Sequence, residues 1–235
     1  MAASSSLPVR KSQNLAAKAA PTEFVKTYEI FGIKQGGFTL VEMAIVLVIV
    51  GLILGGILNS RSLISGMQAK DIVAIVDDLR TASAYFKQRY NYLPGDFPVN
   101  AGDIANVAPP GGNGDGSIDG TINAQGLAAA GSEVAEAPWQ LYNAGLLGKI
   151  NSSEPQRRIR TTFGGVHLAS NATASGLIAG YGNPSVRNVI IIANLPCDMV
   201  NEVDNKVDDG VATTGRAIGN ACGANGAVDF YAVAL

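Results

Sequence analysis

An acidic residue, Glu42, lies inside a long apolar run that extends from Phe38 to Leu58. Placing a charged side chain in hydrocarbon costs about 2.5 kcal/mol or more on insertion scales. A helix that begins at Met43, with Glu42 reaching the membrane surface, would avoid part of this cost. We favour the other interpretation, in which the carboxylate finds a cationic partner.

A suitable cation would appear if the chain were cut between Gly37 and Phe38. The new α-amino group would lie one helical turn before Glu42. In a helical array of copies, the amine of one subunit could pair with the carboxylate of its neighbour, so that both charges are neutralised in hydrocarbon. Only the correct axial stagger satisfies both groups, and Glu42 would then set the register of the assembly.

The chain has two cysteines, Cys197 and Cys222, both near its C-terminus. An even pair in an exported domain predicts one disulfide, which would stabilise the domain by roughly 3 kcal/mol. Two buried thiols are the alternative.

Oxygen-bearing side chains alternate with glycines over Asn113, Asp115, Ser117 and Asp119. Calcium takes six to eight oxygen ligands and could use such a run. In the twelve-residue calcium loop, however, the first and twelfth positions would be Gly111 and Ile122, so both acidic ligands are missing. A calcium site and a solvated Gly-Asp turn both remain open, and calcium is the single cofactor that the sequence suggests.

The composition restricts the class of protein. The 235 residues leave room for one globular domain with attachments, and a net charge of -2 with 15% charged residues argues against nucleic-acid binding. The single histidine, His167, lacks a base-and-orienter set, so we interpret it as a strand residue and expect no enzyme. Asn151 and Asn171 begin formal glycosylation sequons, which carry little information in a bacterial chain.

One long helix must position Glu42. The apolar run is long enough, at roughly 30 Å, to cross a bilayer, and the basic residues before it predict a cytoplasmic N-terminus and an exported remainder. No proline follows until Pro94. We therefore predict a continuous helix over 38–90, whose apolar stripe packs on the following domain: Ile64, Met67, Ile72, Ile75, Leu79, Ala82, Phe86 and Tyr90.

The rest of the chain predicts a smaller α+β head. Leu93–Pro98 should end the long helix, and shorter helices are expected at 137–147 and 198–207. Strands of an antiparallel sheet are expected at 161–169, 176–180, 186–193, 211–218 and 228–235.

The segment Lys34-Gln-Gly-Gly37 followed by Phe38-Thr-Leu-Val-Glu42 resembles the signature of type IV prepilins and type II secretion pseudopilins. The resemblance covers about 25 residues and implies a pilin-like fold, with the long helix packed on the sheet. It implies that a prepilin peptidase cuts after Gly37 and methylates Phe38, and that Glu42 is the assembly glutamate. The leader is longer than in common type IV pilins.

The resemblance implies a division into a leader (1–37), a membrane and assembly helix (38–58), the amphipathic half of that helix (59–93) and a head with a C-terminal disulfide loop (94–235). It implies a filament subunit, held in the inner membrane and then assembled outside the cytoplasm. Its expected partners are identical or related pilins, the peptidase and an inner-membrane assembly platform. A type II secretion pseudopilin is the alternative, and a membrane-anchored enzyme or ligand-binding protein is the alternative of a different class.

Overall fold

The computed structural model describes residues 37–148, 150–151 and 158–235 of the chain. Apart from Gly37, the predicted leader therefore lies outside the described residues. Contacts divide the chain into two units, with the boundary between Val48 and Ile49. The second unit contains the sheet and the elements that pack on it.

Helix α1 spans Leu40–Tyr90 and is the long helix that the sequence predicts, with its start two residues later than expected. It ends where Asn91 adopts a φ of 63° and donates its N–H to the carbonyl of Lys87 at 2.8 Å. Asparagine is among the few residues that tolerate this left-handed conformation, which closes many helices. The break expected at Leu93–Pro98 follows directly.

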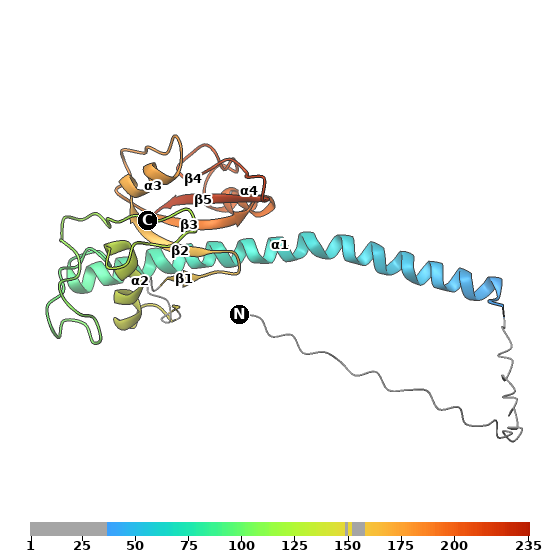
Figure 1. Ribbon diagram of the computed structural model, residues 1–235, viewed down its shortest axis with the longest axis horizontal. Helices are drawn as coiled ribbons and strands as arrows, with labels where there is room; N and C mark the ends of the chain where they lie inside the picture. The colour runs from blue at the N-terminus through green and yellow to red at the C-terminus, as the bar shows by residue number, and fades with distance from the viewer. Residues whose placement is uncertain (1–36, 149, 152–157) are drawn as a thin grey trace, which may run out of the picture. The chain divides into compact units, whose positions relative to one another are not determined.

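The second half of α1 packs along the sheet within the second unit (Figure 1). Arg80 fastens it there, because its Nε and Nη2 donate to the carbonyl of Ala234 at 3.0 and 2.8 Å. The predicted stripe is wrong at its first two positions, since Ile64 and Met67 are 53% and 67% exposed. Buried apolar positions begin at Ala69 and recur at helical spacing: Ala69, Ile72, Val76, Leu79, Ala82 and Phe86.

Within the described residues, five strands form one antiparallel sheet in the order β1-β2-β3-β5-β4. The β-branched run Val189–Ile192 occupies the central strand β3 and is fully buried. Ile190 lies opposite Leu168 on one side and Val233 on the other. The α+β fold with an antiparallel sheet is thus confirmed. The strands are β1 (Ile159–Arg160), β2 (Gly165–Ser170), β3 (Asn188–Pro196), β4 (Ile218–Gly219) and β5 (Ala227–Ala234).

Local hydrogen bonds explain where the predicted elements differ from the observed ones. The strand expected at 176–180 is wrong, because Ser170 caps a short helix, α3 (Asn171–Leu177), which covers part of that segment. The strand expected at 211–218 is also wrong except at Ile218, since Asp209 accepts from the N–H of Val211 and from the Thr214 hydroxyl.

Two further helices lie close to their predicted positions. Helix α2 (Glu133–Asn143) begins four residues earlier than expected because Ser132 caps it, accepting from the N–H of Ala135. Helix α4 (Cys197–Val207) matches the predicted short helix, and Asp208 follows it.

Candidate processing and assembly site

Thr39 and Glu42 form a reciprocal pair at the start of α1. The N–H of Glu42 donates to the Thr39 hydroxyl at 3.2 Å, and Oε2 of Glu42 accepts from the N–H and the hydroxyl of Thr39, both at 2.9 Å. This is the capping box, in which a threonine and a glutamate three residues later satisfy N–H groups that a helix start leaves open.

The capping box changes the interpretation of Glu42. The burial cost of Glu42 in an apolar run predicts a carboxylate that lacks a partner in its own chain, but the Thr-x-x-Glu spacing indicates a helix cap. The carboxylate in fact has a polar partner, which holds it toward the N-terminal end of the helix. Thr39 is uncharged, so this contact positions the Glu42 carboxylate without neutralising its charge.

The position expected to be cut lies just before this cap. Gly37, Phe38 and Thr39 precede the helix, which begins at Leu40. Gly37 and Phe38 are both exposed, and a Cβ placed on Gly37 would meet no described atom within 4 Å. Among the described residues, none covers the peptide bond between Gly37 and Phe38, and a protease needs such access.

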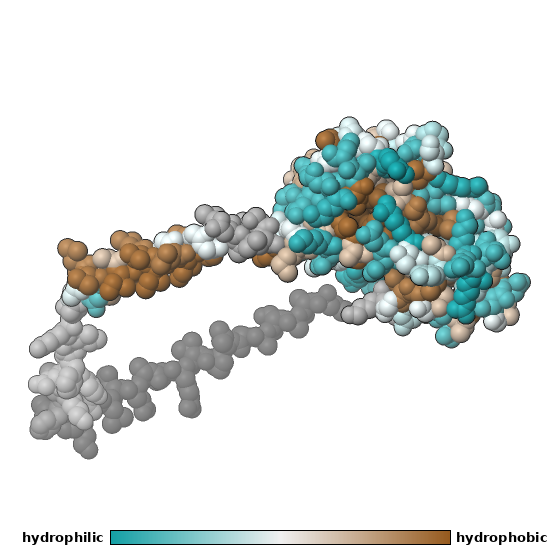
Figure 2. Space-filling view, turned by 180° about the vertical axis from the view of Figure 1, so that it is seen from behind, coloured by the Kyte–Doolittle hydropathy of each residue, from teal (hydrophilic) through white to brown (hydrophobic). Residues whose placement is uncertain are grey.

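The residues after the cap form an apolar surface. Leu40–Ile57 is long and apolar enough to cross a membrane by length and composition, and it is the one such helix among the described residues. Figure 2 shows these apolar side chains in brown on the face it presents. Their exposure in the chain alone means that something else must cover them, because a contiguous apolar surface of this kind is unfavourable in water.

Three glycines lie within this apolar segment, at Gly51, Gly55 and Gly56. A Cβ built on any of them would meet no described atom within 4 Å outside the helix's own neighbouring backbone. Nothing that the structure describes in this chain requires a glycine there. These glycines can therefore allow another helix to approach closely, or allow this helix to unwind locally.

The two cysteines are joined in the structure. Cys197 opens α4 and Cys222 lies between β4 and β5, with their Cα atoms 5.8 Å apart. The N–H of Cys197 donates to the carbonyl of Gly226 at 3.0 Å, which holds the two segments together beside the bridge. The bond closes a loop that contains α4 and β4.

The remaining single residues of interest have structural roles. His167 lies fully buried in β2, where burial lowers its pKa to about 4, and its Nε2 lies 2.9 Å from the carbonyl of Gly126. The Asn171 side-chain nitrogen donates to the carbonyls of Asn183 and Val186 at 2.5 and 2.7 Å, so that sequon is engaged in the fold. Of the sequon that begins at Asn151, Ser153 lies outside the described residues.

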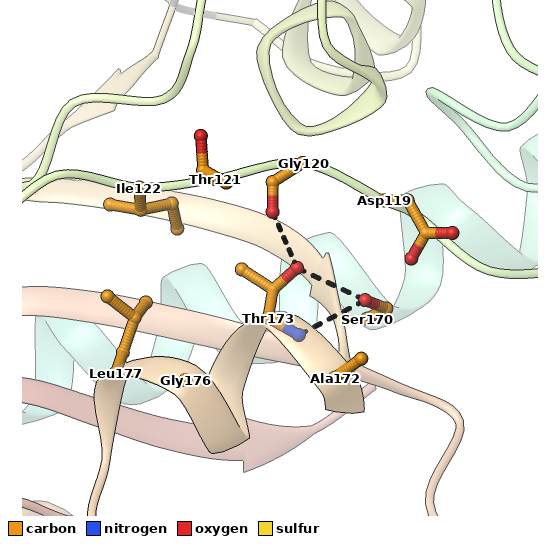
Figure 3. Close-up of a pocket in the computed structure, with 9 residues that line it drawn as sticks. All are labelled: Asp119, Gly120, Thr121, Ile122, Ser170, Ala172, Thr173, Gly176 and Leu177. Carbon is orange, nitrogen blue, oxygen red and sulfur yellow. Dashed lines mark hydrogen bonds between the residues drawn. The ribbon is translucent and has the colours of Figure 1, made fainter.

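A cavity of about 380 Å³ lies between α3 and the segment Asp119–Ile122 (Figure 3). Thr173 joins the two walls by donating its hydroxyl to the carbonyl of Gly120 at 2.8 Å, and its N–H donates to the capping hydroxyl of Ser170 at 3.3 Å. The lining holds one carboxylate, Asp119, and no histidine or cysteine. Across the described part of the chain, no three His, Cys, Asp or Glu side chains converge as a ready-made metal site.

Comparison with known proteins gives one finding. The family model described as the prokaryotic N-terminal methylation motif matches residues 33–58, which include Gly37, Phe38, the capping box and the whole apolar segment to Leu58. No curated protein and no solved structure matches the chain.

Proposed function

We propose that this chain, which carries the prepilin-type methylation signature at residues 33–58, is a structural subunit of a type IV pilus-like filament. The single observation that carries the proposal is the charged Glu42, held by Thr39 at the first turn of an exposed apolar helix. That combination is unfavourable in an isolated chain and becomes favourable when copies pack side by side.

Cleavage between Gly37 and Phe38 creates the missing cation. Phe38 then carries the new amine, which methylation leaves positively charged. Because Thr39 holds the Glu42 carboxylate near the end of the helix, the amine of a neighbouring subunit can reach it without first reorganising the helix start. Away from water, the attraction between the Phe38 amine and the Glu42 carboxylate is strong, but either charge left unpaired there is costly. The pairing therefore selects the one axial stagger between subunits that brings the two groups together.

The proposed organisation follows the predicted domains. The leader, residues 1–37, is removed; residues 38–58 hold the chain in the inner membrane and later form the filament core. Residues 59–93 carry the head, residues 94–235, on the other side of the membrane. The basic residues of the leader favour a cytoplasmic N-terminus. The partners are other pilin subunits, a prepilin peptidase and an assembly platform, and the role is structural, without catalysis.

The same signature is shared by the pseudopilins of type II secretion. A secretion role would use the same cut and the same carboxylate but would leave the filament in the periplasm. Immunogold labelling of intact cells separates the two, since a pilus subunit is labelled on the surface and a pseudopilin is not.

The experiment that tests the proposal is mass spectrometry of the intact protein from membranes of cells that contain a prepilin peptidase. The expected mature chain begins at Phe38 and carries one additional methyl group. Gly37→Leu should leave the uncut precursor in the membrane, because a bulky side chain replaces the exposed glycine before the bond. A wild-type mature chain that begins at Met1, or at any residue other than Phe38, would overturn the proposal.

A further inference from the structure

The glycine-rich loop with alternating oxygen-bearing side chains, residues 111–119, closes around a buried carboxylate from elsewhere in the chain. Asp96 is 1% exposed. Its carbonyl accepts from the N–H of Gly114 at 2.9 Å, and its Oδ2 accepts from the N–H of Gly116 at 3.0 Å. A Cβ at Gly112 would lie 2.4 Å from the Asp96 Cα, so the loop backbone packs directly on this residue.

The second oxygen of Asp96 is the unusual feature. Its Oδ1 is buried and has no hydrogen-bond partner among the described residues. An unpaired carboxylate oxygen away from water is costly, and such groups in proteins are normally hydrogen-bonded or bound to a cation. Because Oδ2 of the same carboxylate is fixed to Gly116, Oδ1 is also held at the loop.

A second carboxylate from outside the loop joins its two ends. Glu133, the first residue of α2, accepts from the N–H of Asn113 through Oε1 at 2.8 Å and from the N–H of Asp119 through Oε2 at 2.7 Å. Burial raises the pKa of both Asp96 and Glu133, the hydrogen bonds from loop N–H groups oppose that shift, and neighbouring carboxylates add to it. The loop that carries Asp115 and Asp119 thus also holds the carboxylates of Asp96 and Glu133.

Asp96 and Glu133 can replace the two acidic ligands that the loop sequence lacks. In the twelve-residue calcium loop, the first and twelfth positions are acidic and the sixth is a glycine at a sharp turn. Here Gly116 occupies the sixth position with a φ of 88°. The missing acids are supplied in space, by Asp96 packed at the beginning of the loop and Glu133 bridging its ends.

We propose that the loop 111–119, together with Asp96 and Glu133, binds Ca²⁺. The ligands are the carboxylates of Asp96, Asp115 and Glu133, the Asn113 amide oxygen and the main-chain carbonyl of Ser117, with Asp119 near the position that often binds through water.

Among the described residues no three acidic side chains converge in the absence of an ion, so the carboxylates of Asp96, Asp115 and Glu133 have to draw together when Ca²⁺ binds. Amide and carbonyl oxygens make up part of a calcium shell, and like-charged carboxylates separate until a cation draws them together. Arg187 also reaches the loop, but through the carbonyl of Asp115 and the Ser117 hydroxyl rather than through a carboxylate. Arg187 therefore does not donate to the carboxylates, whose hydrogen bonds come from loop N–H groups and the Asn113 amide.

Calcium would join the end of α1 to α2, because Asp96 follows the break after α1 and Glu133 opens α2. Binding would stabilise the head, since an ion that binds the native state alone shifts the unfolding equilibrium. The inference does not depend on filament assembly, and its test can fail or succeed independently of the proposed function.

The test uses terbium luminescence of the full-length chain, purified in detergent. Tb³⁺ takes the same oxygen ligands as Ca²⁺ and is excited by nearby aromatic rings. Tyr92 is such a ring, because its Cε1 would lie 3.0 Å from a Cβ at Gly114. We expect sensitised emission that millimolar Ca²⁺ displaces and millimolar Mg²⁺ does not.

Matched variants separate a built site from charge attraction. Asp115→Asn removes a proposed ligand at an exposed position and should weaken Ca²⁺ displacement of Tb³⁺ at least about 10-fold. Asp229→Asn removes the same charge from another exposed position and should change nothing. Tyr92→Phe should lose the emission yet keep a calcium-dependent rise in Tm of roughly 5–10 °C at saturation. Absence of Ca²⁺-displaceable emission from folded wild type, or equal affinity in Asp115→Asn, would overturn the proposal.

Discussion

The two halves of α1 contrast in where their apolar side chains find cover. From Ala69 onward, one face of the helix is buried against the sheet of its own chain. From Phe38 to Ile57, every described side chain is exposed. The second half thus buries its apolar surface by folding, whereas no residue that the structure describes covers the apolar surface of the first. The helix therefore joins a part that stabilises the head to a part whose cover, in the function proposed above, is a membrane or an assembly.

The largest difference between the halves should appear in a pair of leucine substitutions. Leu79 is fully buried, and Leu79→Ala should cost about 3–5 kcal/mol of head stability by loss of burial and by the cavity left behind. Leu47 is 72% exposed, so Leu47→Ala should leave the unfolding of the head unchanged. Thermal unfolding of the full-length chain in detergent, followed through the single tryptophan, Trp139, measures both.

Equal effects of the two substitutions on Tm would contradict this contrast between the halves of α1. A large effect of Leu47→Ala would mean that the first half of α1 also packs on the head. A negligible effect of Leu79→Ala would mean that the buried stripe contributes little to head stability.

A smaller effect is expected on the pH dependence of head stability, through the buried acid Asp204. Asp204 is fully buried in α4, where the Tyr231 hydroxyl donates to its Oδ1 at 2.5 Å, and burial raises the pKa of its carboxyl. A raised folded pKa means that the folded state holds the proton more tightly. Protonated Asp204 therefore stabilises the folded state. This stabilisation is fully present below the ordinary pKa of 3.8 and is lost as the pH rises through the raised pKa of the folded state.

The Tm of wild type should accordingly fall relative to that of Asp204→Asn as the pH is raised from about 3.5 to 7, because the amide keeps an acceptor for Tyr231 without a charge. Each unit of pKa elevation corresponds to about 1.4 kcal/mol. Asp229→Asn, at an exposed site, serves as the charge control. A Tm difference between wild type and Asp204→Asn that is constant over this pH range would contradict the assignment.

Sequence patterns predicted the features that depend on neighbours along the chain. The long helix followed from unbroken helical spacing, and β3 from its β-branched run. Residues 176–180 and 211–218 were misassigned as strands because the hydroxyl of Ser170 and the carboxylate of Asp209 reorganise the backbone locally. The apolar content of these two segments favours strands, whereas the contacts of Ser170 and Asp209 favour a short helix and a turn.

The candidate sites also differ in whether their residues are neighbours along the chain. Gly37, Phe38 and Glu42 could be singled out because all lie in one short segment, and the capping role of Thr39 was readable there too. Asp96 and Glu133 could not be placed at the glycine-rich loop, because only the folded chain brings the end of α1 and the start of α2 to it. Contacts between distant segments of this kind leave no local pattern.

The central claim, that the charge of Glu42 sets the register of a filament, is tested by the yield of sheared filaments from cells expressing single variants. Glu42→Gln keeps the capping box but lacks the charge, whereas Thr39→Val keeps the charge but loses the cap. We predict that both are inserted and cut after Gly37, that Thr39→Val enters filaments, and that Glu42→Gln and Glu42→Val do not. Normal filament yield from Glu42→Gln, or equal failure of Thr39→Val, would contradict the account, because Glu42 would then act as a helix cap and not as a charge.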